Sequence, residues 1–266
     1  MKKWVKVVVS TFVLAGVLGM HTSPREAAVQ KSLTVQASAD YVKLFDDLKS
    51  ELKKAGVTLK LEELKEENPY EEITSGKVDL LLHGTLADLN HSEERDKIDV
   101  VFGVGGDPLE LHGPGELSSL GDGSEVFLPE EAPLQTRALT LLAKEKLVSL
   151  DESKVDRANL EAVSENKHQL KLTLVPLADL GQKADGKSWV LLPHSVAVEK
   201  KLENPLSTEL PKHSTVCALA KKGVLNKPEY KAIKKVLTTR AGQKALDNHK
   251  SDHVANTYYD PQRLGQ

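Results

Sequence analysis

The chain has 266 residues, of which 39% are hydrophobic, 28% charged and 4% aromatic, and its formal net charge is −3. This composition is typical of a globular protein long enough for two modest domains. Interspersed charges and scarce aromatics argue against a nucleic-acid partner. The chain has one cysteine, Cys217, so an internal disulfide and a cysteine-rich metal site are excluded. Cys217 stands in an apolar run, which predicts a buried, inert thiol.

The first 30 residues have the pattern of a bacterial export signal. Three lysines precede an apolar run at residues 7–19, which is too short to span a bilayer comfortably. A lipoprotein signal would place a cysteine after a Leu-Ala-Gly-like tripeptide, but Val17 stands there, so the lipid attachment site is missing. We expect an exported protein, periplasmic or cell-surface associated. Cleavage after Ala28 and retention as an uncleaved anchor both stay open.

Strand and helix patterns alternate from residue 32 to residue 104. Predicted strands are residues 32–37, 57–61, 78–82 and 98–104, and predicted helices are residues 40–55, 70–75 and 86–95. This order predicts a parallel sheet with crossover helices.

The Gly-rich run at residues 103–108 resembles a phosphate loop only superficially. It lacks the Lys-Ser/Thr of a P-loop and the full dinucleotide fingerprint, so we interpret it as a turn. The Gly- and Pro-rich residues 109–123 predict a crossover between lobes. The chain has no Gly-x-Ser-x-Gly elbow and no His-Glu-x-x-His motif, so we expect neither an enzyme nor a cofactor.

The second half continues the alternation. Predicted strands are residues 126–128, 170–174, 188–192 and 215–220; predicted helices are residues 134–142, 177–183, 194–202 and 228–246, with weaker helix signals at 151–165.

The most informative stretch is residues 125–142, EVFLPEEAPLQTRALTLL. A strand, a proline-marked loop and a helix with Arg137 in its first turn are predicted here. Helix N-termini at the carboxyl ends of strands bind anions, and a guanidinium there can hold a carboxylate bidentately. The alternative is a solvated helix arginine.

The chain resembles the methionine-binding lipoprotein family (NlpA/MetQ type), the substrate-binding proteins of bacterial methionine ABC importers. The resemblance covers residues 32–243. It rests on SLTVQASAD, on Pro69, Glu71 and Gly76 before VDLLL, on the block from Leu120 to Leu142 containing Arg137-Ala138-Leu139, on SENKHQLKL and on LENP.

This resemblance implies a two-lobed, type II periplasmic-binding-protein-like α/β clamp, each lobe a mostly parallel sheet flanked by helices. We expect lobe 1 to comprise residues 31–110 and 213–266 and lobe 2 residues 111–212. The implied function is binding of methionine, a related amino acid or a small carboxylate, delivered to a membrane ABC permease. In the family the arginine of this block grips the ligand carboxylate, and the resemblance carries that role to Arg137.

Other pocket positions depart from the family pattern. Histidines stand at or near four of them, and Thr215 ends the run that replaces the family's Tyr-x-Asn. The resemblance thus gives as candidate ligand residues His83, His112, His194, His213 and Thr215. If the four histidines converge, the site prefers a metal ion, a metal chelate or a polar ligand; the alternative is scattered surface histidines.

A rival interpretation is a relative that kept the scaffold and lost the ligand, acting as a surface interaction protein. The altered pocket and the absent lipid-attachment cysteine favour it.

Overall fold

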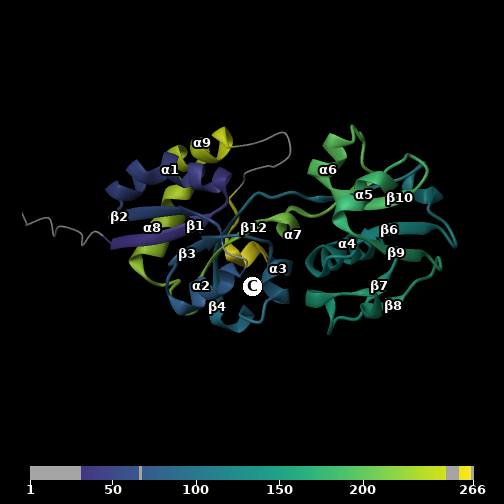
Figure 1. Ribbon diagram of the computed structural model, residues 1–266, viewed down its shortest axis with the longest axis horizontal. Helices are drawn as coiled ribbons and strands as arrows, with labels where there is room; N and C mark the ends of the chain where they lie inside the picture. The colour runs from purple at the N-terminus through teal and green to yellow at the C-terminus, as the bar shows by residue number, and fades with distance from the viewer. Residues whose placement is uncertain (1–30, 66–67, 250–257, 265–266) are drawn as a thin grey trace, which may run out of the picture.

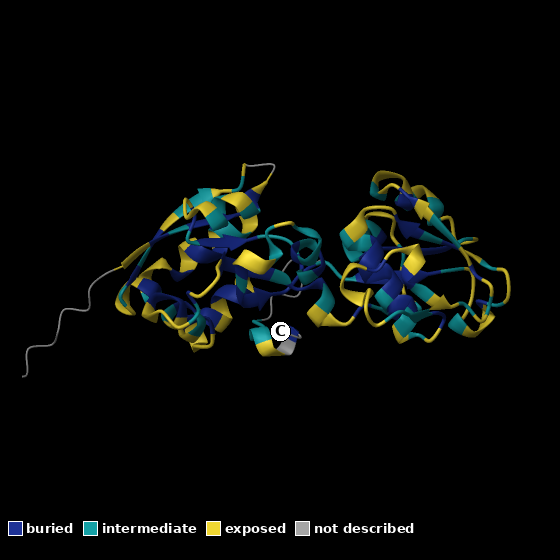
Figure 2. Cartoon of the chain, turned by 90° about the horizontal axis from the view of Figure 1, so that it is seen from below, coloured by how far each residue is buried: buried dark blue, intermediate teal, exposed yellow. Residues whose placement is uncertain are grey.

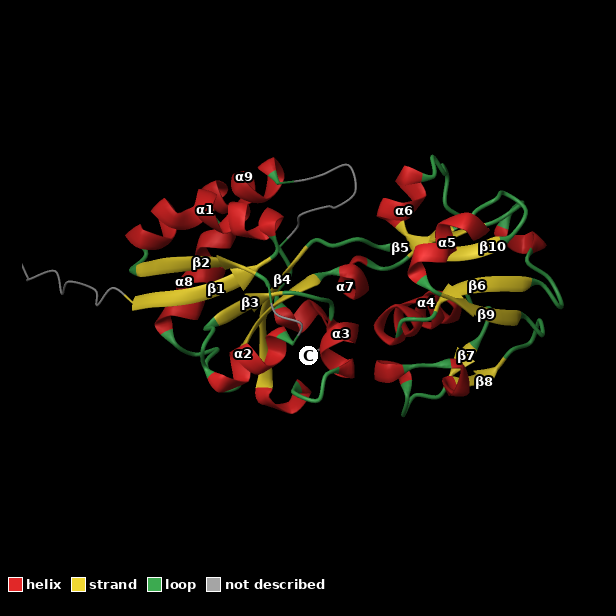
Figure 3. Ribbon diagram, viewed as in Figure 1, coloured by secondary structure: helices red, strands yellow, loops and turns green. Residues whose placement is uncertain are grey.

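The computed structural model describes residues 31–65, 68–249 and 258–264. Two five-stranded sheets, each flanked by helices, form two α/β lobes at opposite ends of the long axis (Figures 1 and 3). The predicted two-lobed α/β fold is confirmed. The expected export signal lies outside the described residues. Among the helices that the structure does describe, none is both long enough and apolar enough to cross a membrane.

The first lobe contains a sheet with the strand order β2-β1-β3-β12-β4. Its strands are β1 (Lys31–Ala37), β2 (Val57–Glu63), β3 (Leu80–Leu82), β4 (Ile98–Val104) and β12 (Val216–Lys221). β1 is parallel to β2 and β3, whereas β12 runs antiparallel to β3 and β4. Apolar, often β-branched residues in these short runs favour strands buried on both faces.

Helices of the first lobe form where apolar residues recur every three or four positions. In α1 (Ala39–Lys54) the buried residues Leu44, Phe45, Leu48 and Leu52 form one stripe against the sheet. The remaining helices are α2 (Pro69–Ser75), α3 (Leu86–His91), η1 (Arg95–Lys97), α8 (Pro228–Leu237), α9 (Arg240–Asn248) and η5 (Pro261–Leu264). Gly76 ends α2 with a left-handed φ of 82°, a conformation that glycine adopts without strain.

The second lobe contains a sheet with the order β11-β5-β10-β6-β9 and a small β7-β8 ribbon. Its strands are β5 (Leu109–His112), β6 (Glu125–Pro129), β7 (Ser149–Leu150), β8 (Val163–Glu165), β9 (Lys171–Val175), β10 (Trp189–Pro193) and β11 (Ser207–Thr208). Its helices are η2 (Leu117–Ser119), α4 (Ala132–Lys144), η3 (Val155–Arg157), η4 (Leu160–Ala162), α5 (Leu177–Lys183) and α6 (His194–Glu199). The lobe's largest apolar cluster joins its sheet to buried residues of α4.

Each lobe has its own buried interior (Figure 2). Cys217 is fully buried in β12, as predicted, and burial raises the pKa of its thiol to about 12. An inert, buried thiol is the result.

The chain passes between the lobes in two crossovers, residues 105–108 and residues 209–215, the second containing α7 (Pro211–Ser214). In each sheet, the strand that follows a crossover, β5 or β12, pairs antiparallel with its neighbours. Residues 109–123 were predicted to form a crossover. This prediction is wrong for residues 109–112, which form β5 and pair with β10 and β11. The weak helix signals at residues 151–165 correspond to two 3-10 turns and β8 rather than to an α-helix.

Candidate functional site

Arg137 lies on α4 on the side that faces the crossovers. The helix begins at Ala132, earlier than predicted, because Pro133 fits its first turn. Arg137 therefore belongs to the second turn, so the predicted first-turn position is wrong and the free N–H groups of the helix end are not beside it. The side chain is buried, with the residue 6% exposed, so it is not a solvated helix arginine.

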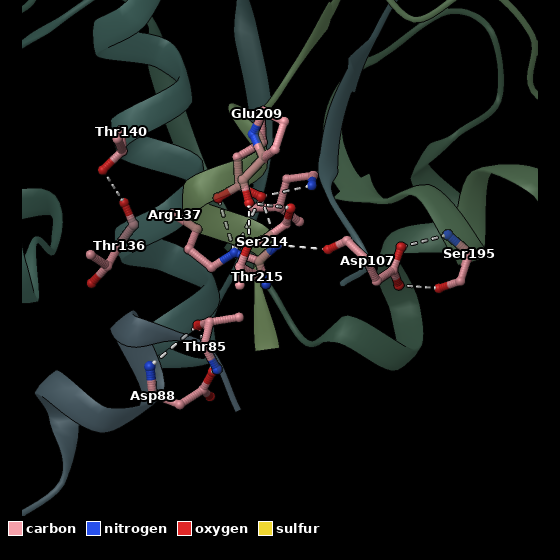
Figure 4. A network of polar contacts seen from close by, with 12 residues as sticks. Thr85, Asp88, Asp107, Thr136, Arg137, Thr140, Ser195, Glu209, Ser214 and Thr215 are labelled. Atoms are coloured by element: carbon pink, nitrogen blue, oxygen red, sulfur yellow. Dashed lines mark hydrogen bonds and ion pairs between the residues drawn. The ribbon is translucent and has the colours of Figure 1, made fainter. Parts of the chain in front are cut away.

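The guanidinium is paired with a carboxylate of the chain itself. Arg137 Nε donates to Glu209 Oε1 at 3.0 Å, and Arg137 Nη2 donates to Glu209 Oε2 at 2.6 Å (Figure 4). Glu209 is 4% exposed. This is the bidentate arrangement that an arginine makes with a carboxylate ligand. We refer to Arg137 and Glu209 as the junction pair.

The junction pair ties the two crossovers together. Arg137 Nη2 also donates to the backbone oxygen of Asp107, at 2.7 Å, in the first crossover. Glu209, in the second crossover, accepts from the backbone N–H of Leu109 at 3.0 Å and donates its own N–H to the Leu109 oxygen at 2.8 Å. Both crossovers are thus fastened to α4 by one side chain.

The crossovers also approach each other closely on the side of the first lobe. A Cβ added to Gly106 would lie 1.8 Å from the backbone oxygen of Ser214, so only glycine fits there. The Gly-rich run at residues 103–108 was interpreted as a turn. It contains the end of β4 and the first crossover, and Gly106 is required for the close packing of the two crossovers.

Asp107 connects the first crossover to α6. Its carboxylate accepts from the backbone N–H and from the hydroxyl of Ser195, at the start of that helix (Figure 4). A carboxylate at a helix start satisfies N–H groups that have no partner within the helix.

The structure brings two of the four predicted histidines together. His112 Nε2 lies 2.9 Å from Glu110 Oε2, and His194 Nδ1 lies 2.8 Å from Glu110 Oε1. Glu110 and His112 are buried in β5, and His194 begins α6. The three residues form one hydrogen-bonded group inside the second lobe.

The other two histidines lie apart from this group and from each other. His83 follows β3 and contacts the ring of Tyr70, with ring centroids 5.8 Å apart. His213 lies in α7 beside Arg137. Burial lowers the pKa of both His83 and His213, so both are uncharged at neutral pH.

Among the described residues, the four histidines thus share neither one hydrogen-bonded group nor one of the cavities between the lobes. Within residues 31–65, 68–249 and 258–264, no three His, Cys, Asp or Glu side chains are grouped so that they could hold a metal ion. Thr215 is 1% exposed, and its hydroxyl donates to the Pro211 oxygen at 2.7 Å.

Two cavities lie between the lobes. The junction cavity, of about 240 Å³, is lined on one side by Leu86 and Asn90 of α3 and on the other by Arg137, Asp156 and His213. The outer cavity, of about 360 Å³, is lined mainly by first-lobe residues, among them Tyr70, His83 and His91, and by Pro133 of α4.

The lobes touch through α3, which packs against α4 and η3. His91 Nε2 lies 2.9 Å from Thr136 Oγ1, and Asn90 Nδ2 donates to the Asp156 oxygen at 3.5 Å. Thr85 and Asp88 form a capping box that fixes the start of α3 (Figure 4). Of the residues that the sequence singled out, Arg137, His213 and His83 line the two cavities between the lobes, whereas His112 and His194 lie inside the second lobe.

Three bonding partners of the predicted residues were missed by the sequence interpretation: Glu209, Asp107 and Glu110. Each is an acid next to or within a short strand or crossover, and such acids are common along the chain. Glu209 is preceded by five uncharged residues, 204–208, a weak signal that could have marked it.

The family described as NlpA lipoprotein matches residues 33–258. A comparison with curated protein sequences gave no match.

Solved structures share the fold. A YaeC-family lipoprotein from Enterococcus faecalis superposes with a TM-score of 0.72 at 16% identity, covering 85% of this chain and 99% of that one. A nutrient-binding protein from Burkholderia cenocepacia bound to methionine gives 0.60 at 17% identity, covering 85% and 99%. The substrate-binding protein of a methionine transporter from Streptococcus pneumoniae gives 0.58 at 22% identity, covering 85% and 95%.

Proposed function

The chain belongs to the NlpA lipoprotein family, and from this premise we propose that it is the substrate-binding component of a bacterial ABC importer. It acts outside the cytoplasm, holds a small amino-acid-like ligand between its lobes and delivers it to a membrane permease. Its mechanism is binding and lobe closure, without catalysis. Methionine binding by relatives of the same fold supports methionine or a related compound as the ligand.

One observation carries this proposal. A buried arginine stands where both crossovers meet, and it lines a cavity closed by residues of both lobes. Ligand pockets commonly form between domains, with a few fixed polar groups that set orientation. Arg137 and His213 are the proposed ligand contacts in the junction cavity, and His83 is a proposed contact in the outer cavity.

The remaining predicted residues are proposed to position the site. His112 and His194 are bonded to Glu110, and Thr215 is bonded to the backbone of α7. These bonds fix β5, α6 and the second crossover around Arg137, which supports a framework role.

A thermal-shift screen of the purified protein with amino acids, their amides, dipeptides and divalent metals tests the proposal. A ligand at a hundred times its Kd stabilises the folded protein by about 2.7 kcal/mol, so at least one organic compound is expected to raise the Tm. A screen in which none does so would contradict a binding function.

A second candidate is a relative that lost its ligand and acts as a surface interaction protein. The junction pair favours it, because the guanidinium fork that would hold a ligand is already occupied. A negative screen together with capture of a protein partner from the cell surface by cross-linking would support this candidate.

A further inference from the structure

We propose that Glu209 acts as an internal carboxylate on Arg137 and that it makes the cleft selective for ligands whose carboxyl group is absent or blocked as an amide. The inference rests on the proposed function for the claim that a small ligand enters this cleft. Glu209 is then the residue that decides which amino-acid-like compounds are accepted.

The geometry of the pair carries the first step. Two nitrogens on one edge of the guanidinium, Nε and Nη2, meet the two carboxylate oxygens of Glu209 at 3.0 and 2.6 Å. Nη2 is further occupied by the Asp107 oxygen at 2.7 Å. A ligand carboxylate can therefore not bind this edge of the fork bidentately unless Glu209 leaves.

Glu209 is held too firmly to leave readily. Its side chain is 1% exposed, and besides Arg137 it accepts from the Leu109 N–H at 3.0 Å. Its own backbone N–H is bonded to the Leu109 oxygen. Displacing the carboxylate would leave the Glu209 charge and the Leu109 N–H without their partners, and this penalty opposes its exchange for a ligand carboxylate.

The charges of the junction pair also disfavour a ligand carboxylate. The buried pair is neutral, so Arg137 has no uncompensated positive charge for a second anion. A ligand carboxylate near Nη1 would also lie close to the Glu209 carboxylate in a region of low dielectric, where like charges repel strongly. His213 does not offset this repulsion, because burial lowers its pKa and it is uncharged at neutral pH.

Two other charged residues line the junction cavity, Asp156 and Lys212, but they are of opposite sign and both are exposed, so they add no net charge. The remaining polar groups of the lining are neutral hydrogen-bonding groups. Of the guanidinium nitrogens, Nη1 makes no hydrogen bond to any residue that the structure describes. It can donate to an uncharged oxygen such as an amide carbonyl, while Asn90 and His213 line the same cavity. An amide in place of the carboxylate keeps this acceptor and removes the repulsion.

The test compares amino acids with their amides, using isothermal titration of the twenty free amino acids and the matching amino-acid amides. The variant is Glu209→Gln, which keeps the size of the side chain and one acceptor oxygen but removes the charge. We expect the wild type to bind an amide at least about tenfold more tightly than its free acid, and Glu209→Gln to gain binding of a free acid by about tenfold or more.

The matched control is Glu229→Gln. Glu229 is also a buried, ion-paired glutamate, 6% exposed and 2.6 Å from Lys31, but it lies on α8 and lines neither cavity. It should leave the preference between acid and amide unchanged.

Three outcomes overturn the inference: wild-type binding of a free acid as tight as that of its amide, no gain of acid binding by Glu209→Gln, or the same gain by Glu229→Gln. If Glu209→Gln does not fold, the wild-type preference alone decides. A wild type that binds neither acids nor amides contradicts the proposed function and, with it, the amide preference. A wild type that binds an acid and its amide equally well contradicts the inference alone, so the two failures are distinguishable.

Discussion

The crossover junction and the contact between α3 and α4 are both polar, but their polar groups are used differently. At the junction, Arg137 and Glu209 are buried and bonded at distances down to 2.6 Å. Between α3 and the second lobe, the hydrogen bond of His91 to Thr136 measures 2.9 Å. The bond from Asn90 to the backbone oxygen of Asp156 is longer, at 3.5 Å. The difference indicates that the polar groups of the junction are held more firmly than those of the contact along α3.

Removing Arg137 should weaken the junction most and cause the largest loss of stability. Arg137→Met leaves the buried Glu209 carboxylate without its partner, so we expect the free energy of unfolding to fall by about 3–5 kcal/mol. Urea denaturation measures it. Arg157→Met, an exposed arginine of η3, is the control and should cost less than about 0.5 kcal/mol.

The double variant Arg137→Met/Glu209→Gln checks the cause. Because it removes the stranded charge, it should recover much of the lost stability. A double variant as unstable as Arg137→Met would mean that packing, and not the unpaired carboxylate, sets the loss.

Gly106→Ala should perturb the junction next most strongly. The added methyl would overlap the Ser214 oxygen, so the crossovers must move apart, at about 1–3 kcal/mol. Gly121→Ala is the matched control, because its nearest non-neighbouring atom is 4.0 Å from the added Cβ. Equal melting temperatures for the two variants would contradict close contact between the crossovers.

Lowering the pH should reduce the stability of the protein through three partly buried histidines. Burial lowers the pKa of His83, His91 and His213, so the unfolded chain binds more protons than the folded one below about pH 6.5. We expect the free energy of unfolding to be maintained above that pH and to fall between pH 6.5 and 5. His213→Gln should flatten this slope.

The smallest effect on stability should come from His91→Ala, which removes the short bond across the lobes. We expect a loss below about 1 kcal/mol but a larger population of open molecules, seen as an increased radius of gyration in small-angle X-ray scattering. Glu93→Ala, an exposed residue lining the outer cavity, is the control. An unchanged radius would show that α3 does not hold the lobes closed.

The sequence was a good guide wherever local pattern decides the structure. Residues 98–104 and 177–183 were predicted with the bounds that the structure has, because apolar runs and helical spacing there are bounded by glycine, proline or charged residues. β5 was missed because its four residues stand between Pro108 and Gly113, in a segment whose composition is typical of a loop.

The candidate site was harder to predict, because its contacts are long-range. The Arg137 motif indicated a carboxylate partner, but the partner is Glu209, which lies 72 residues further along the chain. The resemblance predicted four pocket histidines, but the sequence did not fix their side-chain directions, and Glu110 bonds to two of them inside the second lobe. Residue type was therefore informative, whereas pairing required the folded structure.

The inaccessibility of Cys217 has a practical consequence. It is the chain's one cysteine, and its thiol has a pKa raised to about 12. Maleimide dyes react with thiolates, so the native protein should stay unlabelled. Cysteines introduced at Lys49 and Lys167, exposed positions on opposite lobes, would then carry a donor and an acceptor fluorophore, and energy transfer between them could follow single molecules as the clamp opens and shuts.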